Sequence, residues 1–314
     1  MALSMRSISR LFGDSAPIIG VLLAALTLGG CSAMRIGYNT GPTLLYWWLD
    51  SYLDFDSEQS TRVRNDLQAA HDWHRQFELP LLGKMIGDLQ TMTHRPVTSE
   101  QVCSLVDALQ VRLHITMERL TPTIAAIAPT LQNAQLEHMT KEFERRDRKW
   151  REEWIDGTLA QRTERRIKQI VERAESFYGP LEPGQVAVVR AHIESSSFDG
   201  PRQFREMQRR HQDALQVLQK IRGADAGINP TQSLAEIREL LGRTLKAPSP
   251  SHARYMAQLT TESCRAMAAL HNSSTPDQRT RLLQTLKGYE GDVRALNGQA
   301  SSDIPSDNPG TSAF

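Results

Sequence analysis

Apolar residues recur at every third or fourth position along nearly every segment of this 314-residue chain, which is the spacing of one face of an α-helix. No stretch of useful length alternates between apolar and polar residues, as a half-buried strand would. The pattern therefore predicts an all-α fold, either a multi-helix bundle or an elongated helical array. The predicted helices cover residues 43–54, 58–94, 99–120, 132–156, 161–178, 183–195, 200–222, 231–246, 251–271 and 276–296.

Turn-forming residues mark the breaks between these helices. Pro80 is expected to kink or break the helix in which it lies. A division is expected near residue 225, inside a loop of small and turn residues, and Pro248 and Pro250 stiffen the next connection. The predicted units are a signal peptide at 1–30, an N-terminal helical body at 31–225, C-terminal helices packed on it at 226–296, and a disordered tail at 297–314.

The first 31 residues have the pattern of a secreted precursor. Arg6 and Arg10 precede an apolar run from Ile18 to Leu28, and Gly29-Gly30-Cys31 follows. A transmembrane anchor is the alternative, but an 11-residue helix spans only about 17 Å of a hydrocarbon core about 30 Å thick. The segment resembles the bacterial lipobox, in which the chain is cut before the cysteine and the cysteine is acylated.

The lipobox resemblance implies a membrane partner and a location. Cys31 carries the lipid that attaches the chain to the membrane. The next residue is Ser32 rather than Asp, which by resemblance to the sorting of Gram-negative lipoproteins favours the outer membrane, with the fold facing the periplasm.

Charge argues against a nucleic-acid partner. Of the 37 basic and 36 acidic side chains, Arg6, Arg10 and Asp14 leave with the signal peptide, so the mature chain keeps 35 of each sign. Nucleic-acid binders show a basic excess, which this chain lacks.

Two cysteines remain once Cys31 is assigned to lipid. In an oxidising compartment, Cys103 and Cys264 are predicted to form a disulfide. The alternative is that they are two small buried side chains far apart in the fold.

A short pattern, a helix-capping residue followed three positions later by glutamine, recurs along the chain. In the ordinary capping box, the cap side chain accepts a hydrogen bond from the backbone amide three residues later. The glutamine at that later position accepts a hydrogen bond from the backbone amide of the cap residue. The pattern also resembles the Leu-Thr-x-x-Gln motif of small helical periplasmic chaperones of the Spy and CpxP type. The glutamines are Gln59, Gln101 and Gln278, with degenerate copies at Gln135 and Gln185.

The stretch from Tyr38 to Phe55 is the densest in aromatic residues. Leu44, Trp48, Tyr52 and Phe55 share one helical face, which is expected either to seal the core or to lie at the headgroup level of a membrane. Some of these residues can seal the core while others lie at the membrane interface.

The same stretch carries a family resemblance. The run Tyr46-Trp47-Trp48-Leu49-Asp50, continued by Tyr52, Asp54 and Phe55, resembles an uncharacterised family of Gram-negative lipoproteins. Trp73-His74-Arg75, Leu79-Pro80, Ala174-Glu175 and Tyr178-Gly179 fit the same family. The resemblance implies an envelope location and a helical fold, and it transfers no catalytic residue.

Candidate chemistry is sparse. His71, His74 and Glu78 fall at a spacing that permits a metal, but the favoured interpretation is a polar helix face, so no metal and no cofactor are predicted. The fingerprints of serine hydrolases, zinc proteases, P-loops and dinucleotide folds are absent, and we expect no enzyme activity.

The charged run from Lys141 to Trp154 is the candidate binding surface. Its proposed contact residues are Arg148, Trp150, Arg151 and Trp154, because Arg and Trp are favoured hot spots of protein interfaces. Burial of the two tryptophans is the competing interpretation.

The sequence thus predicts a lipid-anchored scaffold that binds an unidentified envelope protein. The alternatives are a periplasmic chaperone or envelope-stress sensor, and a hydrolase of cell wall or lipids.

Overall fold

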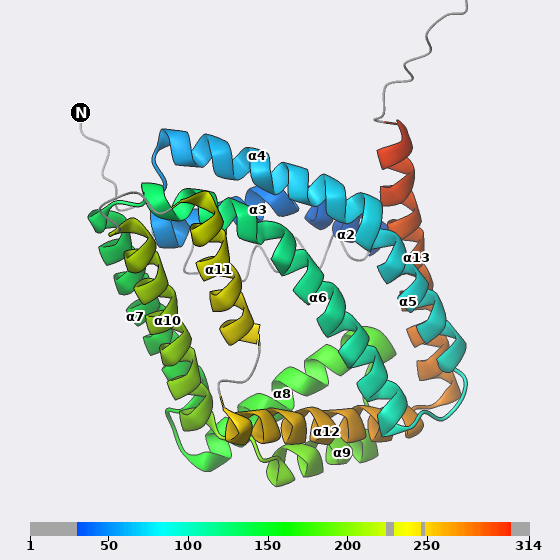
Figure 1. The fold of residues 1–314 in the computed structure, drawn as a ribbon. Coiled ribbons are helices and arrows are strands. Elements are labelled where there is room, and N and C mark those ends of the chain that lie inside the picture. Colours follow the sequence, from blue (N-terminus) through cyan, green and yellow to red (C-terminus); the bar gives the residue numbers. More distant parts are fainter. Residues whose placement is uncertain (1–29, 224–228, 246–248, 303–314) are drawn as a thin grey trace, which may run out of the picture.

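The computed structural model describes residues 30–223, 229–245 and 249–302. These ranges are helical apart from short connections and contain no strand, which confirms the predicted all-α fold (Figure 1). The predicted signal peptide lies outside the described residues up to position 29, as does the tail from position 303.

The helix positions follow the predicted pattern closely. The helices are α2 (Gly30–Asn39), α3 (Gly41–Leu53), α4 (Ser57–Trp73), the π-helical turn η1 (His74–Glu78), α5 (Leu79–Met92), α6 (Ser99–Ile127), the 3-10 turn η2 (Ala128–Thr130), α7 (Asn133–Trp154), α8 (Leu159–Tyr178), α9 (Pro183–Ser195), α10 (Gly200–Arg222), α11 (Pro230–Leu245), α12 (Pro250–Asn272) and α13 (Pro276–Ser302).

Three segments differ from the sequence prediction. Helix α6 continues to Ile127, beyond the expected end at residue 120. Helix α2 was not predicted. Helix α13 continues to Ser302, so residues 297–302 are helical and do not belong to a disordered tail. Extending an existing helix through small polar residues costs far less free energy than starting a new one.

Pro80 produces the expected break in the long helix. The chain passes from α4 through η1 into α5, and Figure 1 shows its direction changing there. The Leu79 amide donates to the carbonyl of His74, five residues back. Because proline has no amide hydrogen and its ring collides with the carbonyl four residues before it, a wider π turn accommodates it.

The helices form an open frame with one diagonal member. In Figure 1, α4 lies along one edge, α5 and α13 run side by side along the next, and α12 and α9 along the edge opposite α4. Helices α7 and α10 pack together on the remaining edge, and α6 crosses between α11 and α12. The C-terminal helices α11, α12 and α13 all pack against earlier helices.

The core is divided among the joints of this frame. The largest apolar cluster joins α3, α4, α6, α7, α10 and α11, with Val63, Leu67, Ile221 and Ile237 at its centre. Smaller clusters lie at the α6–α12 crossing, between α5 and α13, and between α8 and α9.

Two buried pairs of glutamines connect helices at the joints. Gln59 and Gln135 face each other across the N-termini of α4 and α7, and the Gln135 amide donates to Gln59 Oε1 at 2.7 Å. Each side-chain oxygen also accepts its own cap amide, from Asp56 at 3.2 Å and from Gln132 at 2.8 Å. The Gln135 amide further donates to the Leu53 carbonyl at 3.0 Å.

The second pair repeats this arrangement with different helices. Gln185 and Gln278 lie at the N-termini of α9 and α13 and exchange hydrogen bonds of 2.6 and 2.9 Å. Gln185 donates to the Ser273 carbonyl at 3.0 Å, and Gln278 to the Pro180 carbonyl at 2.8 Å. Each glutamine therefore caps its own helix, and its side-chain amide also donates a hydrogen bond to a backbone carbonyl just before its partner's helix.

Capping boxes without a buried partner also occur. Gln101 caps α6 and lies exposed. Gln161 caps α8 through Thr158 and is also exposed, and sequence reasoning missed this copy.

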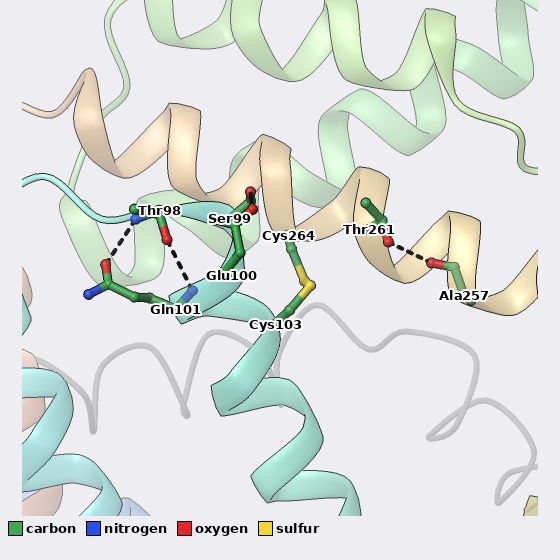
Figure 2. The surroundings of a disulfide bond; sticks show 8 residues. All are labelled: Thr98, Ser99, Glu100, Gln101, Cys103, Ala257, Thr261 and Cys264. Carbon is green, nitrogen blue, oxygen red and sulfur yellow. Dashed lines mark hydrogen bonds between the residues drawn. A yellow bond between two sulfur atoms is a disulfide. The ribbon is translucent and has the colours of Figure 1, made fainter.

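Cys103 and Cys264 join the diagonal helix to the base of the frame. Their sulfur atoms lie 2.09 Å apart and their Cα atoms 5.5 Å apart, between the first turns of α6 and the middle of α12 (Figure 2). The bond closes a loop between residues 161 positions apart. Val97, Val102 and Ala268 pack beside it.

Replacing a paired capping glutamine is expected to cost far more stability than replacing an unpaired one. Gln135→Ala removes the acceptor of the Gln132 cap amide and the donor to the carbonyls of Leu53 and Asp54, so we expect a loss of roughly 3 kcal/mol. Gln161→Ala removes one exposed cap and is expected to cost below about 1 kcal/mol. Urea denaturation of both variants measures the difference, and equal losses would show that the pairing adds nothing.

Removal of the disulfide is expected to lower the free energy of unfolding by roughly 3–5 kcal/mol, because the unfolded chain regains the freedom of a long loop. The matched measurement compares the Cys103→Ser/Cys264→Ser variant with the oxidised protein in urea. Mass mapping under non-reducing conditions must first show the Cys103–Cys264 peptide, and free thiols at both positions would contradict the pairing.

Candidate partner-binding groove and exposed apolar strip

The aromatic stretch of α3 divides its residues between the core and the surface. Tyr46 is buried, its hydroxyl shares a hydrogen bond of 2.9 Å with Ser60 Oγ, and Arg64 lies over its ring. Leu44, Trp47 and Trp48 keep 50 to 57% of their surface exposed. The predicted stripe through Leu44 and Trp48 therefore does not face the core as a unit.

Helix α2 continues this exposed face toward Cys31. Ile36 is 62% exposed. The Leu44 amide donates to the Thr40 carbonyl, and the Thr40 amide to the Ile36 carbonyl, so α2 and α3 are nearly one continuous helix. Ile36, Leu44, Trp47 and Trp48 are thus exposed apolar side chains along α2 and α3, and we call them the exposed apolar strip.

Polar side chains fix α2 on the body. The Tyr38 hydroxyl and His74 Nδ1 share a hydrogen bond of 2.9 Å, and His71 Nε2 donates to the Tyr38 carbonyl at 3.0 Å. Arg35 forms an ion pair of 3.3 Å with the buried Asp292 of α13. Helix α2 is therefore bound to two different helices of the frame.

Burial shifts the pKa values of the three side chains in the contact around Tyr38. It raises the pKa of Tyr38 to about 12, and it lowers the pKa of both His71 and His74. At neutral pH the histidines are uncharged and Tyr38 is protonated. The contacts of Tyr38 with His71 and His74 are thus neutral hydrogen bonds, beside the ion pair of Arg35 with Asp292.

The candidate metal residues serve this contact and the core. His71 and His74 bind Tyr38, while Glu78 is buried with its carboxylate 3.5 Å from the Arg112 guanidinium. Within the described ranges, no three His, Cys, Asp or Glu side chains gather where they could hold a metal ion.

An aromatic groove lies between α3, α7, α10 and α11. Its volume is about 540 Å³, and Trp48 and Trp150 both line it. The rings of Trp48 and Tyr52 lie 5.0 Å apart, and those of Tyr52 and Phe143 lie 5.6 Å apart. Phe143 stacks on His211 at 3.9 Å. The residues come from distant parts of the sequence, so sequence reasoning missed this groove apart from Trp150.

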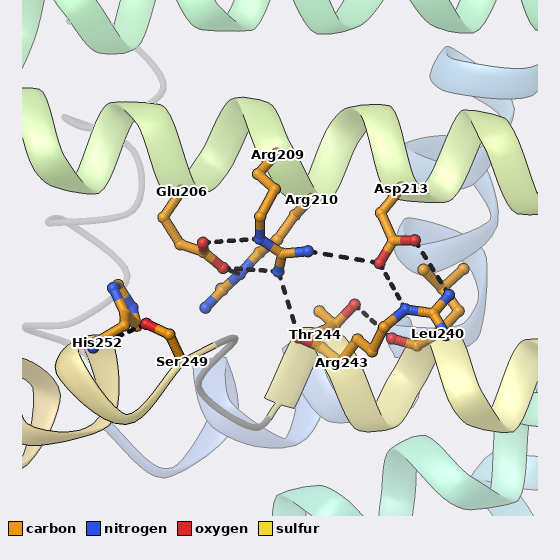
Figure 3. A network of polar contacts seen from close by, with 9 residues as sticks. All are labelled: Glu206, Arg209, Arg210, Asp213, Leu240, Arg243, Thr244, Ser249 and His252. Carbon is orange, nitrogen blue, oxygen red and sulfur yellow. Dashed lines mark hydrogen bonds and ion pairs between the residues drawn. The ribbon is translucent and has the colours of Figure 1, made fainter.

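Charged groups lie along the α10 side of the groove. Glu206 is 7% exposed and accepts hydrogen bonds from Arg209 at 2.8 Å and from Arg210 at 2.9 Å (Figure 3). The Arg209 hydrogen bonds lower the pKa of Glu206, so its carboxylate stays ionised. Arg243 of α11 pairs with Asp213 at 3.0 Å and joins the two helices.

His211 remains neutral despite an acidic neighbour. Its Nδ1 lies 3.1 Å from Asp147. Burial lowers the pKa of His211, against the opposing effect of the Asp147 carboxylate.

The predicted surface of α7 divides between packing and exposure. Trp150 and Trp154 stack at 6.1 Å, and Trp150 also stacks on Phe204 of α10 at 5.6 Å. Both tryptophans are half-buried, whereas Arg148 and Arg151 are exposed. Trp150 therefore joins α7 to α10, while Trp154 packs against Phe198 just before α10 at 5.8 Å. Of the four predicted residues only Trp150 lines the groove.

None of the helices in the described part of the chain has both the length and the apolar character needed to cross a membrane.

Comparison with known proteins identifies a family but no activity. No curated protein and no solved structure matches the chain. The model of a family of unknown function, DUF6279, matches residues 51–244. This range is more than half of the chain and includes α7, α10 and α11 of the aromatic groove. The chain therefore belongs to the DUF6279 family of unknown function.

Proposed function

We propose that this protein is a lipid-anchored scaffold of the outer membrane that faces the periplasm and works by binding another envelope protein, without catalysis. The observation that carries the proposal is the exposed apolar strip. Exposed Trp47 and Trp48 lie on α3, which continues α2, and α2 begins next to the lipobox cysteine and is held to the body by Tyr38 and Arg35. Tryptophan favours the interface between lipid headgroups and water.

The fixed contact of α2 gives the anchor a structural role. A flexible linker after Cys31 would let the body rotate freely above the membrane. Here the helix that follows the anchor is bound to α4 and α13, so acylation at Cys31 would hold the frame in one orientation.

The disulfide supports a location outside the cytoplasm. Disulfides persist in oxidising compartments, of which the periplasm is one. Cys103 and Cys264 are placed for such a bond.

The aromatic groove is the proposed site for the protein partner. Trp, Tyr and Arg are enriched at the hot spots of interfaces. Trp48 is half exposed at the groove, Tyr52 lies beside it, and Arg210 adds a cation. This combination suits a partner that inserts an apolar side chain flanked by an acidic residue.

A periplasmic chaperone is the second candidate, and the capping boxes support it. Their resemblance to the Leu-Thr-x-x-Gln motif includes the two buried pairs Gln59–Gln135 and Gln185–Gln278. Because these glutamines are occupied in joining helices, we favour the scaffold.

Replacement of Cys31 tests the anchor. Cys31→Ala removes the acylation site, and we expect an unprocessed precursor that no longer fractionates with the outer membrane. Fractionation and mass measurement of the variant provide the test, with Ser32→Ala as the matched control that keeps the cysteine. A Cys31→Ala variant that is still cut after Gly30 and stays membrane-bound would exclude the lipobox.

Three alanine variants test the groove against simple packing. Trp48→Ala is expected to lower capture of cross-linked envelope partners about thirtyfold, equivalent to about 2 kcal/mol, with little change in melting temperature. Trp154→Ala is expected to lower the stability by about 2 kcal/mol, because it removes a half-buried stacked ring.

Arg151→Ala is the control, because Arg151 is exposed and pairs only with Asp156 at 3.5 Å among the described residues. It is expected to change neither property. Undiminished capture by a folded Trp48→Ala variant would remove the groove from the binding model.

A further inference from the structure

A second, more apolar cavity lies among α5, α6, α8, α9, α12 and α13. It has a volume of about 570 Å³ and is partly open to solvent. This volume is within the range of small-molecule sites, about 300–1,000 Å³. Its walls include Leu89, Ile170, Phe177, Leu270 and Leu286.

Three polar side chains in the cavity wall, those of Thr93, Tyr178 and His271, are already paired within the protein. His271 Nε2 donates to the Arg95 carbonyl at 3.1 Å, which leaves Nδ1 to accept the Tyr178 hydroxyl at 2.9 Å. The Thr93 hydroxyl donates to the Gln90 carbonyl at 2.9 Å. These groups need no polar partner from a ligand, so this part of the wall favours an apolar occupant.

Arg173 is a cation at the cavity that forms no ion pair with the described residues. Arg173 of α8 lines the cavity and is exposed. Its neighbour Lys168 pairs with Glu172 at 3.8 Å, whereas no carboxylate of the described residues lies within ion-pair distance of the Arg173 guanidinium. Arginine binds carboxylate and phosphate groups through paired hydrogen bonds.

We propose that this cavity binds a single acyl chain with an anionic headgroup, the chain between α8 and α12 and the headgroup at Arg173. A partner helix fits less well. Two turns of an α-helix, about 10 Å wide and about 11 Å long, occupy more than the cavity volume. A chain of methylene groups is narrow, and each methylene withdrawn from water raises affinity about fourfold.

The site is independent of the aromatic groove and of acylation at Cys31. The groove lies between α3, α7, α10 and α11, and it shares no lining residue with this cavity. Failure of the scaffold proposal would therefore leave this one standing, and the reverse also holds.

Photo-cross-linking tests the proposal. The full chain is placed in vesicles of phosphatidylethanolamine and phosphatidylglycerol with a palmitate analogue that carries a diazirine near its methyl end. We expect adducts on peptides of α8 and α12, competed by unlabelled palmitate or by palmitoyl-lysophosphatidylglycerol. The more effective competitor identifies the source of the headgroup. Adducts confined to α2 and α3 would overturn the proposal, because they would report the membrane alone.

Two variants separate the chain from the headgroup. Ala266→Phe fills the cavity and is expected to lower labelling at least tenfold. Arg173→Gln is expected to lower labelling by the palmitate analogue about fivefold and to leave labelling by the matching hexadecanol analogue unchanged. Lys168→Gln is the matched control, because it removes one positive charge from α8 outside the cavity, and it should have no effect.

The outcomes are decisive even if one variant misfolds. Circular dichroism melts show whether Ala266→Phe folds, and unchanged labelling of a folded variant would overturn the proposal. If that variant fails to fold, the Arg173→Gln comparison decides. Equal loss for both analogues, or loss in Lys168→Gln as large as in Arg173→Gln, would contradict a headgroup at Arg173.

Discussion

The frame depends on one constraint: the free backbone amides at the helix N-termini must find hydrogen-bond acceptors where two helices meet. A helix N-terminus leaves backbone amides without partners, and a buried joint brings two such ends together away from water. Gln59 and Gln135 resolve this at one joint, because each amide side chain accepts its own cap amide and donates to the backbone before the other helix. Gln185 and Gln278 do the same at another. Because these hydrogen bonds hold the helix ends together, several separate apolar clusters can stabilise a single fold.

The sequence predicted what local chemistry controls. The helix positions followed from apolar spacing, and the break at Pro80 followed from the missing amide. The capping role of the glutamines was also predictable, because a cap and its amide lie three residues apart. The pairing of Cys103 with Cys264 was inferred from the compartment and not from distance. Each of these inferences needed only neighbouring residues or simple elimination.

The sequence did not predict which distant helices pack against each other. Nothing in a capping box distinguishes Gln59, which is buried against Gln135, from Gln101, which is exposed, because burial depends on which helices meet. The same limit applied to α3. Helical spacing grouped Leu44 with Trp48, but only the positions of α4 and α7 show that Tyr46 is the buried ring. The aromatic groove likewise required α3 and α7 to meet.

Helix α13 contacts several of the features on which the proposals rest. Gln278 joins its N-terminus to α9, Leu282 and Leu286 form one wall of the apolar cavity, and Asp292 binds Arg35 of α2. At 1.5 Å per residue, the step from Gln278 to Asp292 spans about 21 Å of one helix. Helix α13 therefore contributes both to the wall of the cavity and, through Asp292, to the contact that holds α2, so helix geometry sets the spacing between the cavity and that contact.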